Sequence, residues 1–214
     1  MPEPVKRDSP GKSGRGQART RLARRAVVDA ARTLFLDRGY VATTIEAISE
    51  QADVPSATVY RLFSSKLGIL RALLDTSIAG DDQPRAVQER PEIASLFDET
   101  DAHKLLVGFA GVTTAINLRT NDVYRVLVGA AGSDPAAAEL LGEIRQQRDR
   151  GQGQIARSLS RADALKPGLR QRDAADLIHA LMSPEVYRLL VGERGWTPER
   201  YHDWLATTLT QQLT

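Results

Sequence analysis

Apolar residues recur with the period of an α-helix along most of the chain. Over residues 19–38 they fall three and four positions apart, and Gly39 follows as a residue suited to end a helix. Two shorter segments with the same period, 44–51 and 56–63, come next. A fourth helix is expected directly after them, with a serine near residue 65 as its cap. The pattern predicts three N-terminal helices and a fourth that continues from them.

The segment between the first helix and residue 63 carries start and stop signals for two short helices. Thr43-Thr44-Ile45-Glu46 is a capping-box sequence, in which the Thr43 hydroxyl can accept the Glu46 amide. Asp53 is expected in a left-handed turn, because its short polar side chain tolerates positive φ. Pro55 suits the start of the next helix. Two short helices joined by such a turn have the dimensions of a helix-turn-helix.

The rest of the chain also follows a helical pattern. Residues 80–91 are polar, contain two prolines and lack periodicity, so they mark a domain boundary. Further helices are predicted over 92–98, 102–119, 122–131 (capped by Asn121), 135–163, 171–192 (kinked at Pro184) and 197–213. The pattern predicts an all-α protein of about nine to ten helices. An N-terminal three-helix domain with a helix-turn-helix is joined by the fourth helix to a C-terminal helical bundle.

Charge is distributed unevenly over the three expected parts of the chain. Residues 1–18 are polar and basic and are expected to form a disordered arm, ahead of a domain at 19–79 and another at 80–214. Residues 1–80 hold 13 Lys and Arg against 8 Asp and Glu, whereas the remainder is mildly acidic. A basic N-terminal third indicates that this end meets a polyanion.

Composition excludes several classes of protein and site. Ala and Leu make up 53 of the 214 residues and aromatic residues 5%, which disfavours an all-β fold. The chain has no cysteine, and its three histidines lack zinc-type spacing, so we expect no metal, no cofactor and no catalytic residue. No apolar run approaches the ~20 residues that cross a bilayer, and no signal-peptide core follows the basic start. A cytoplasmic protein without a membrane partner is expected.

The second short helix has side chains suited to DNA. Ser56, Ala57 and Thr58 are small, so the helix N-terminus can approach the major groove and offer its amides to phosphate. Tyr60 and Lys66 add a hydroxyl and an ammonium group that can bind backbone oxygens. The residues alone leave an ordinary helical hairpin with a solvated basic face equally open.

The same region resembles a known family. The segments AARTLFLDRGYVATT (Ala30–Thr44) and TTIEAISEQADVPSATVYRLFSSKLGIL (Thr43–Leu70) resemble the DNA-binding domain of TetR-family transcriptional regulators. The resemblance spans about residues 20–79, and residues 182–209 are similar to the end of the ligand-binding domain in one branch of the family. It implies a homodimer built through the last two long helices of each subunit, here 171–192 and 197–213.

The resemblance also implies roles for individual residues. Thr44, Tyr60 and Lys66 match positions that contact phosphates, and Ala57, Thr58 and Arg61 match positions near base edges. The candidate DNA-contacting set is Thr43, Thr44, Ser56, Ala57, Thr58, Tyr60, Arg61 and Lys66.

The expected function is a ligand-responsive transcriptional regulator. We expect a repressor that binds a near-palindromic DNA operator as a homodimer and is released by a small hydrophobic effector. Polar groups amid the apolar helices of the second domain are candidates for orienting that effector, together with a buried ring: Phe109, Thr113, Asn117 and Tyr124.

Two alternatives are considered beside this hypothesis. One is a helical enzyme whose hairpin only resembles a DNA-binding motif; it lacks metal-ligand spacing, a nucleotide loop and a nucleophile–base motif. The other is a protein-interaction adaptor, which would not need the basic N-terminal segment. We therefore expect a regulator and not an enzyme.

Overall fold

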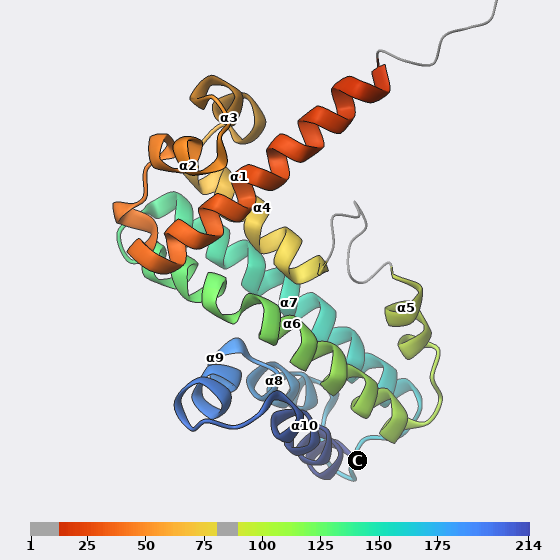
Figure 1. Ribbon diagram of the computed structural model, residues 1–214. Helices are drawn as coiled ribbons and strands as arrows, with labels where there is room; N and C mark the ends of the chain where they lie inside the picture. The colour runs from red at the N-terminus through yellow and green to blue at the C-terminus, as the bar shows by residue number, and fades with distance from the viewer. Residues whose placement is uncertain (1–12, 81–89) are drawn as a thin grey trace, which may run out of the picture. The chain divides into compact units, whose positions relative to one another are not determined.

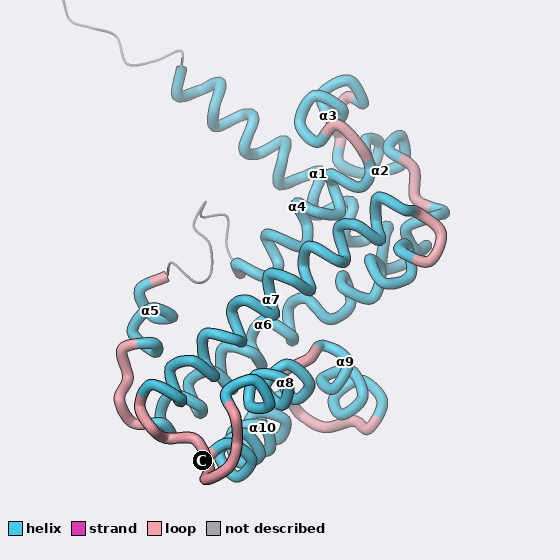
Figure 2. The backbone as a smooth tube through the Cα atoms, turned by 180° about the vertical axis from the view of Figure 1, so that it is seen from behind, coloured by secondary structure: helices cyan, strands magenta, loops and turns pink. Residues whose placement is uncertain are grey.

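The computed structural model describes residues 13–80 and 90–214. Within these ranges the chain is helical and contains no strand, which confirms the expected all-α class (Figure 2). The chain divides into two compact units between Leu73 and Leu74. The two units are described separately below.

The first unit is built from three helices and the start of a fourth. These are α1 (Ser13–Ala42), α2 (Ile45–Ala52), α3 (Ser56–Phe63) and α4 (Lys66–Ala79), of which the last continues into the second unit. Figure 1 shows α2 and α3 beside the C-terminal half of α1. Their shared core is apolar and almost fully buried, with contributions from Val27, Phe35, Ile48, Val59 and Phe63.

The first helix begins earlier than its sequence pattern predicts. Residues 13–18 were expected in the disordered arm, but α1 already starts at Ser13; the rest of that arm, 1–12, lies outside the described residues. Helix extension adds one hydrogen bond for each residue fixed, so a helix nucleated in the core can propagate outward through Gly16. The Thr20 hydroxyl supports this turn by donating to the Gly16 carbonyl at 3.0 Å.

The ends of the first two helices lie at residues with positive φ, Gly39 and Asp53. Gly39 lies within α1 at φ 78° and ψ 170°, so the regular helix ends there, as the sequence predicts. Asp53 ends α2 in the left-handed region at φ 51° and ψ 42°, which confirms the turn conformation predicted for it. Its backbone amide donates to the Glu50 carbonyl at 3.2 Å, and α3 begins three residues later.

The second unit is organised around two long helices. α6 (Ala102–Ala131) and α7 (Pro135–Arg161) lie side by side and are joined by a short turn (Figures 1 and 2). The short α5 (Pro91–Phe97) packs on α6, while α8 (Gln171–Leu181), α9 (Pro184–Tyr187), the π-helix η2 (Arg188–Glu193) and α10 (Pro198–Leu213) complete the bundle. Its core is formed mainly by Leu, Ile and aromatic side chains of α6, α7, α8 and α10.

Two sequence predictions about this unit are wrong. The predicted break at Asn121 does not exist: α6 is one 30-residue helix, because its apolar stripe continues through Val123 and Leu127 into the core. The predicted kinked helix over 171–192 is instead broken at Pro184, where the Ser183 hydroxyl caps a new helix by accepting the Val186 amide at 3.2 Å. Most of the predicted boundary segment at 80–91 lies outside the described residues.

Candidate nucleic-acid interface and effector site

The exposed side of α3 is the candidate nucleic-acid surface. Ala57, Tyr60, Arg61 and Ser64 are exposed and follow the three- and four-residue spacing of one helix face. Val59 and Phe63 lie on the other side, buried against α1 and α2. Tyr60 keeps 48% of its surface exposed. No hydrogen bond or ion pair within the described residues holds Arg61, so its guanidinium group is available to a ligand.

The start of α3 is fixed by hydroxyl contacts with α2. The Ser56 hydroxyl donates to the Ser49 hydroxyl at 3.0 Å, and Ser49 in turn donates to the Val54 carbonyl at 2.6 Å. Ser56 and Thr58 are half-buried, whereas Ala57 between them is exposed. The two hydrogen bonds position α3 relative to α2, so that the exposed face of α3 has a defined direction.

The two threonines before α2 lie in different environments. Thr44 is the N-cap of α2: it is exposed, and its hydroxyl accepts the Ala47 amide at 3.1 Å. Thr43 was predicted to cap this helix and to contact DNA, but it is 1% exposed. Its hydroxyl donates to the Gly39 carbonyl at 2.8 Å and the Leu34 carbonyl at 3.2 Å. The break at Gly39 turns Thr43 inward, so it is withdrawn from the candidate set.

Lys66 also differs from its predicted role as a phosphate ligand. Its ammonium group donates to the carbonyls of Tyr40 at 2.7 Å, Thr43 at 2.8 Å and Val41 at 3.4 Å. It also lies 4.3 Å from the centre of the Tyr40 ring. An ammonium group has three protons to donate, and the three carbonyls at and just after the end of α1 are enough to accept all of them. Lys66 therefore joins the start of α4 to the end of α1.

A close backbone approach explains the glycine that follows Lys66 by two positions. A Cβ atom on Gly68 would lie 2.0 Å from the Phe63 carbonyl oxygen, far inside van der Waals contact. Without a Cβ atom, Gly68 fits in this space, and its amide donates to the Ser65 hydroxyl at 3.0 Å. Glycine at this position allows α4 to start directly against the end of α3.

The four candidate effector residues are spread along α6. All lie on the buried side of α6, but Phe109 and Tyr124 are 15 positions apart, which is about 22 Å along a helix axis. The Phe109 ring packs 4.9 Å from the ring of Phe97. The predicted break at Asn121 would have allowed Tyr124 to fold back toward Phe109, Thr113 and Asn117. Because α6 is continuous, Tyr124 lies further along the same helix. Asn117 remains notable, because its buried Nδ2 has no hydrogen-bond partner within the described residues.

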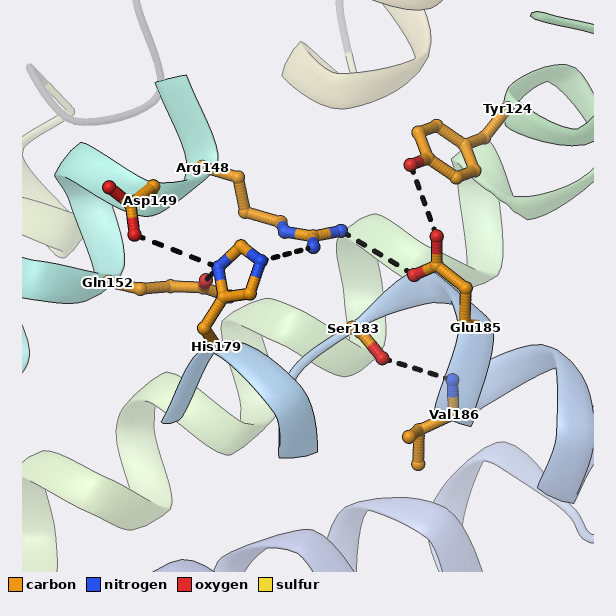
Figure 3. A network of polar contacts seen from close by, with 8 residues as sticks. All are labelled: Tyr124, Arg148, Asp149, Gln152, His179, Ser183, Glu185 and Val186. Atoms are coloured by element: carbon orange, nitrogen blue, oxygen red, sulfur yellow. Dashed lines mark hydrogen bonds and ion pairs between the residues drawn. The ribbon is translucent and has the colours of Figure 1, made fainter. Parts of the chain in front are cut away.

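Tyr124 belongs instead to a polar network that sequence reasoning missed (Figure 3). Its hydroxyl donates to Glu185 at 3.3 Å, and Arg148 lies 3.7 Å from the same carboxylate. Arg148 also contacts His179 Nε2 at 3.0 Å, while His179 Nδ1 lies 2.9 Å from the Gln152 side-chain oxygen. Because arginine only donates, Nε2 accepts and Nδ1 carries the ring proton. The network connects α6, α7, α8 and α9.

A second arginine joins the end of α4 to α6. Arg119 donates from Nε to the Ser77 carbonyl and from Nη2 to the Ile78 carbonyl, both at 3.1 Å. These are carbonyls of the last turn of α4, which no intrahelical amide can reach. Arg119 therefore caps the end of the helix whose start belongs to the first unit.

Two buried tyrosines are the other groups that the sequence did not identify as candidates. Tyr187 is 3% exposed and packs edge-on against Tyr201, with the ring centres 4.9 Å apart. Helical spacing gives no signal that these two rings meet, because they come from separate helices of the second unit.

Two other kinds of site are absent from the part of the chain that the structure describes. None of the helices in ranges 13–80 and 90–214 is long and apolar enough to cross a membrane. No group of His, Asp and Glu side chains in these ranges could hold a metal ion.

Comparison with known proteins identifies the first unit. The family model described as "Bacterial regulatory proteins, tetR family" matches residues 27–73. An uncharacterised HTH-type transcriptional regulator of Bacillus subtilis, YdeS, is 27% identical over 183 residues, which are 84% of each chain. The HTH-type transcriptional repressor KstR2 of Rhodococcus jostii is 42% identical over 79 residues, 35% of each chain.

Solved structures with low sequence identity share the fold of the chain. A putative TetR-family regulator from Syntrophomonas wolfei has a TM-score of 0.68 at 18% identity, over 88% of this chain and 93% of that one. The regulator FadR from Bacillus subtilis, solved in complex with stearoyl-CoA, has a TM-score of 0.64 at 18% identity, over 86% and 96%. The matched N-terminal helices, the relative that aligns over 84% of the chain and the shared fold agree: residues 27–73 match the tetR family of bacterial regulatory proteins, and the chain shares the fold of a putative TetR-family regulator.

Proposed function

We propose that the chain is a ligand-responsive repressor that inserts α3 into the major groove of an operator. The observation that carries this proposal is the exposed face of α3, where Tyr60 and Arg61 extend from a helix anchored by buried Val59 and Phe63. Arg61 has the donor geometry to bind the O6 and N7 atoms of guanine, and Tyr60 and Thr44 offer hydroxyls to phosphate oxygens.

The functional form in this proposal is a homodimer. A symmetric pair of recognition helices reads two half-sites about 34 Å apart, so the operator is a near-palindrome. Support for a dimer comes from Leu189, Leu118 and Val128 of the second unit, which are 46%, 58% and 41% exposed.

Release by a small hydrophobic effector completes the proposal. KstR2 is named a repressor, and the similar FadR structure holds stearoyl-CoA, so repression and effector binding both occur among proteins like this one. The second unit here encloses an apolar core between α6 and α10. In this proposal a molecule bound against α6 acts on α4 through Arg119, since Arg119 holds the carbonyls of Ser77 and Ile78.

A mobility-shift assay combined with light scattering tests this function. The full chain is mixed with the DNA upstream of its own gene and with a scrambled fragment of equal length and composition. We expect retardation of the upstream fragment at protein concentrations that leave the scrambled one free, and a mass in solution twice the 23.4 kDa of one chain. Equal retardation of both fragments, or a monomer mass at micromolar concentration, would contradict the proposal.

A further inference from the structure

Among the buried side-chain atoms of the second unit that have no hydrogen-bond partner in the part of the chain that the structure describes, three belong to one aromatic cluster. They are Asn117 Nδ2 on α6, the Tyr187 hydroxyl at the end of α9 and the Tyr201 hydroxyl on α10. Their residues are 3%, 3% and 0% exposed. Native proteins hold few such groups, because an unpaired buried donor loses its bonds to water without replacing them.

The three groups lie together. The rings of Tyr187 and Tyr201 meet edge-on with their centres 4.9 Å apart. Burial raises the pKa of the Tyr201 hydroxyl, and the Asn117 side chain acts on this pKa in the opposite direction, so the two groups are neighbours although they do not have the geometry of a hydrogen bond. The Trp204 ring follows at 5.8 Å from Tyr201. The cluster therefore combines aromatic surface with three neighbouring donors.

The chemistry of the cluster selects for an uncharged ligand. Burial also raises the pKa of Tyr187, with further contributions from the negative charges of Glu199 and Asp122. Both phenols are thus neutral donors near pH 7. None of the three groups is a cation, and the nearby carboxylates repel anions. An oxygen atom that accepts hydrogen bonds but carries no charge fits this environment.

A short π-helical segment follows Tyr187 directly in the chain. None of the residues of this segment, η2, is fully buried, and its Leu190 and Val191 pack against the core while remaining partly exposed. Short π-helical segments inside longer helices occur frequently at functional sites. This surface segment offers a route by which a molecule reaches the cluster.

We propose that Asn117, Tyr187 and Tyr201 form the polar end of a binding site for an uncharged apolar molecule with a carbonyl or hydroxyl oxygen. The oxygen accepts hydrogen bonds from the amide and the phenols, while the apolar part of the molecule lies among the aromatic rings. The assignment of this molecule as the effector rests on the function proposed above; its binding does not.

Four molecules of equal chain length separate the possible ligand chemistries: 2-decanone, 1-decanol, decane and decanoate. Binding to the full chain is followed by tryptophan fluorescence, since one of the two tryptophans of the chain, Trp204, lies beside the cluster and the other, Trp196, lies 6.1 Å from it. We expect the ketone and the alcohol to bind about tenfold or more tightly than decane and decanoate, the factor of one net hydrogen bond.

Two variants and a matched control test the assignment of residues. Tyr201→Phe is expected to lower ketone affinity about tenfold while the melting temperature of the free protein stays the same or rises, because an unpaired hydroxyl is removed. Asn117→Leu is expected to lower ketone affinity likewise. Thr114→Val is the control: Thr114 is buried on the same helix, but its hydroxyl donates to the Ala110 carbonyl at 2.8 Å. Its ketone affinity is expected to be unchanged.

The outcomes distinguish this inference from the proposed function. Equal affinity for all four molecules, or full ketone affinity in Tyr201→Phe, overturns the inference. A lower melting temperature of Tyr201→Phe without ketone binding to the parent chain assigns the cluster to internal water and also overturns it. Mobility-shift assays on the same samples are read separately. Operator binding without ketone binding leaves the proposed function standing, whereas failure to bind the operator counts against that function whatever the ketone does.

Discussion

Arg61→Ala is expected to weaken binding to the operator by about 5- to 150-fold, the range that corresponds to 1–3 kcal/mol for a lost base contact. Arg61 is exposed on the face of α3 shared with Ala57 and Tyr60, and no described residue competes for its guanidinium group. A base contact carries sequence information, so the variant is expected to lose its base preference at one position of each half-site and to keep it at the others. Fluorescence anisotropy with operator and scrambled duplexes over a salt series measures both effects.

Arg145→Ala serves as the control for this substitution. Arg145 is also an exposed arginine, but it lies on α7 in the second unit, and its removal changes the net charge equally. We expect its operator affinity to stay within about twofold of the parent value, because a remote charge acts only through screened long-range attraction. If Arg61→Ala weakens binding to operator and scrambled DNA by the same factor, the residue contacts phosphate and does not read a base.

Lys66→Met is expected to destabilise the first unit by about 2–3 kcal/mol, the contribution typical of hydrogen bonds to a charged group. The substitution keeps an apolar stem over the Tyr40 ring but leaves the carbonyls of Tyr40 and Thr43 without the ammonium group. Urea denaturation followed by circular dichroism measures the loss as a lower midpoint. DNA affinity is expected to fall only through the smaller folded fraction.

The salt dependence of DNA binding distinguishes the two roles considered for Lys66. A lysine on phosphate would reduce the log–log salt slope by roughly one unit and leave stability unaltered. A lysine that caps α1 leaves the slope of the folded protein unchanged and lowers stability. A reduced slope with a wild-type urea midpoint would show that the ammonium group leaves the α1 carbonyls to bind DNA.

Local signals predicted much of the first unit. The three-residue turn around Asp53 and the bounds of α3 follow from short-range rules on left-handed conformations, proline and apolar spacing. The capping rule placed the N-cap of α2 one residue too early, at Thr43 instead of Thr44. Either threonine satisfies a capping pattern, and the choice depends on the backbone turn at Gly39, which directs Thr43 toward the Gly39 carbonyl.

Long-range contacts account for what the sequence did not predict. Lys66 binds carbonyls 23 to 26 positions earlier in the chain, so local spacing could not show that its protons were occupied. Asn121 matches a helix cap locally, but packing of α6 against α7 and α10 keeps the helix continuous. The rings of Tyr187 and Tyr201 meet only because α9 and α10 pack in one core.

Selection from a random DNA pool tests most directly whether α3 reads sequence as half of a dimer. The full chain is incubated with random duplexes at physiological salt, and bound DNA is amplified and sequenced over several rounds. We predict enrichment of an inverted repeat whose half-sites lie about 34 Å apart or a multiple of that distance, with one conserved position per half-site lost when Arg61→Ala is used. A bound pool with no sequence enriched over the starting one would contradict the account.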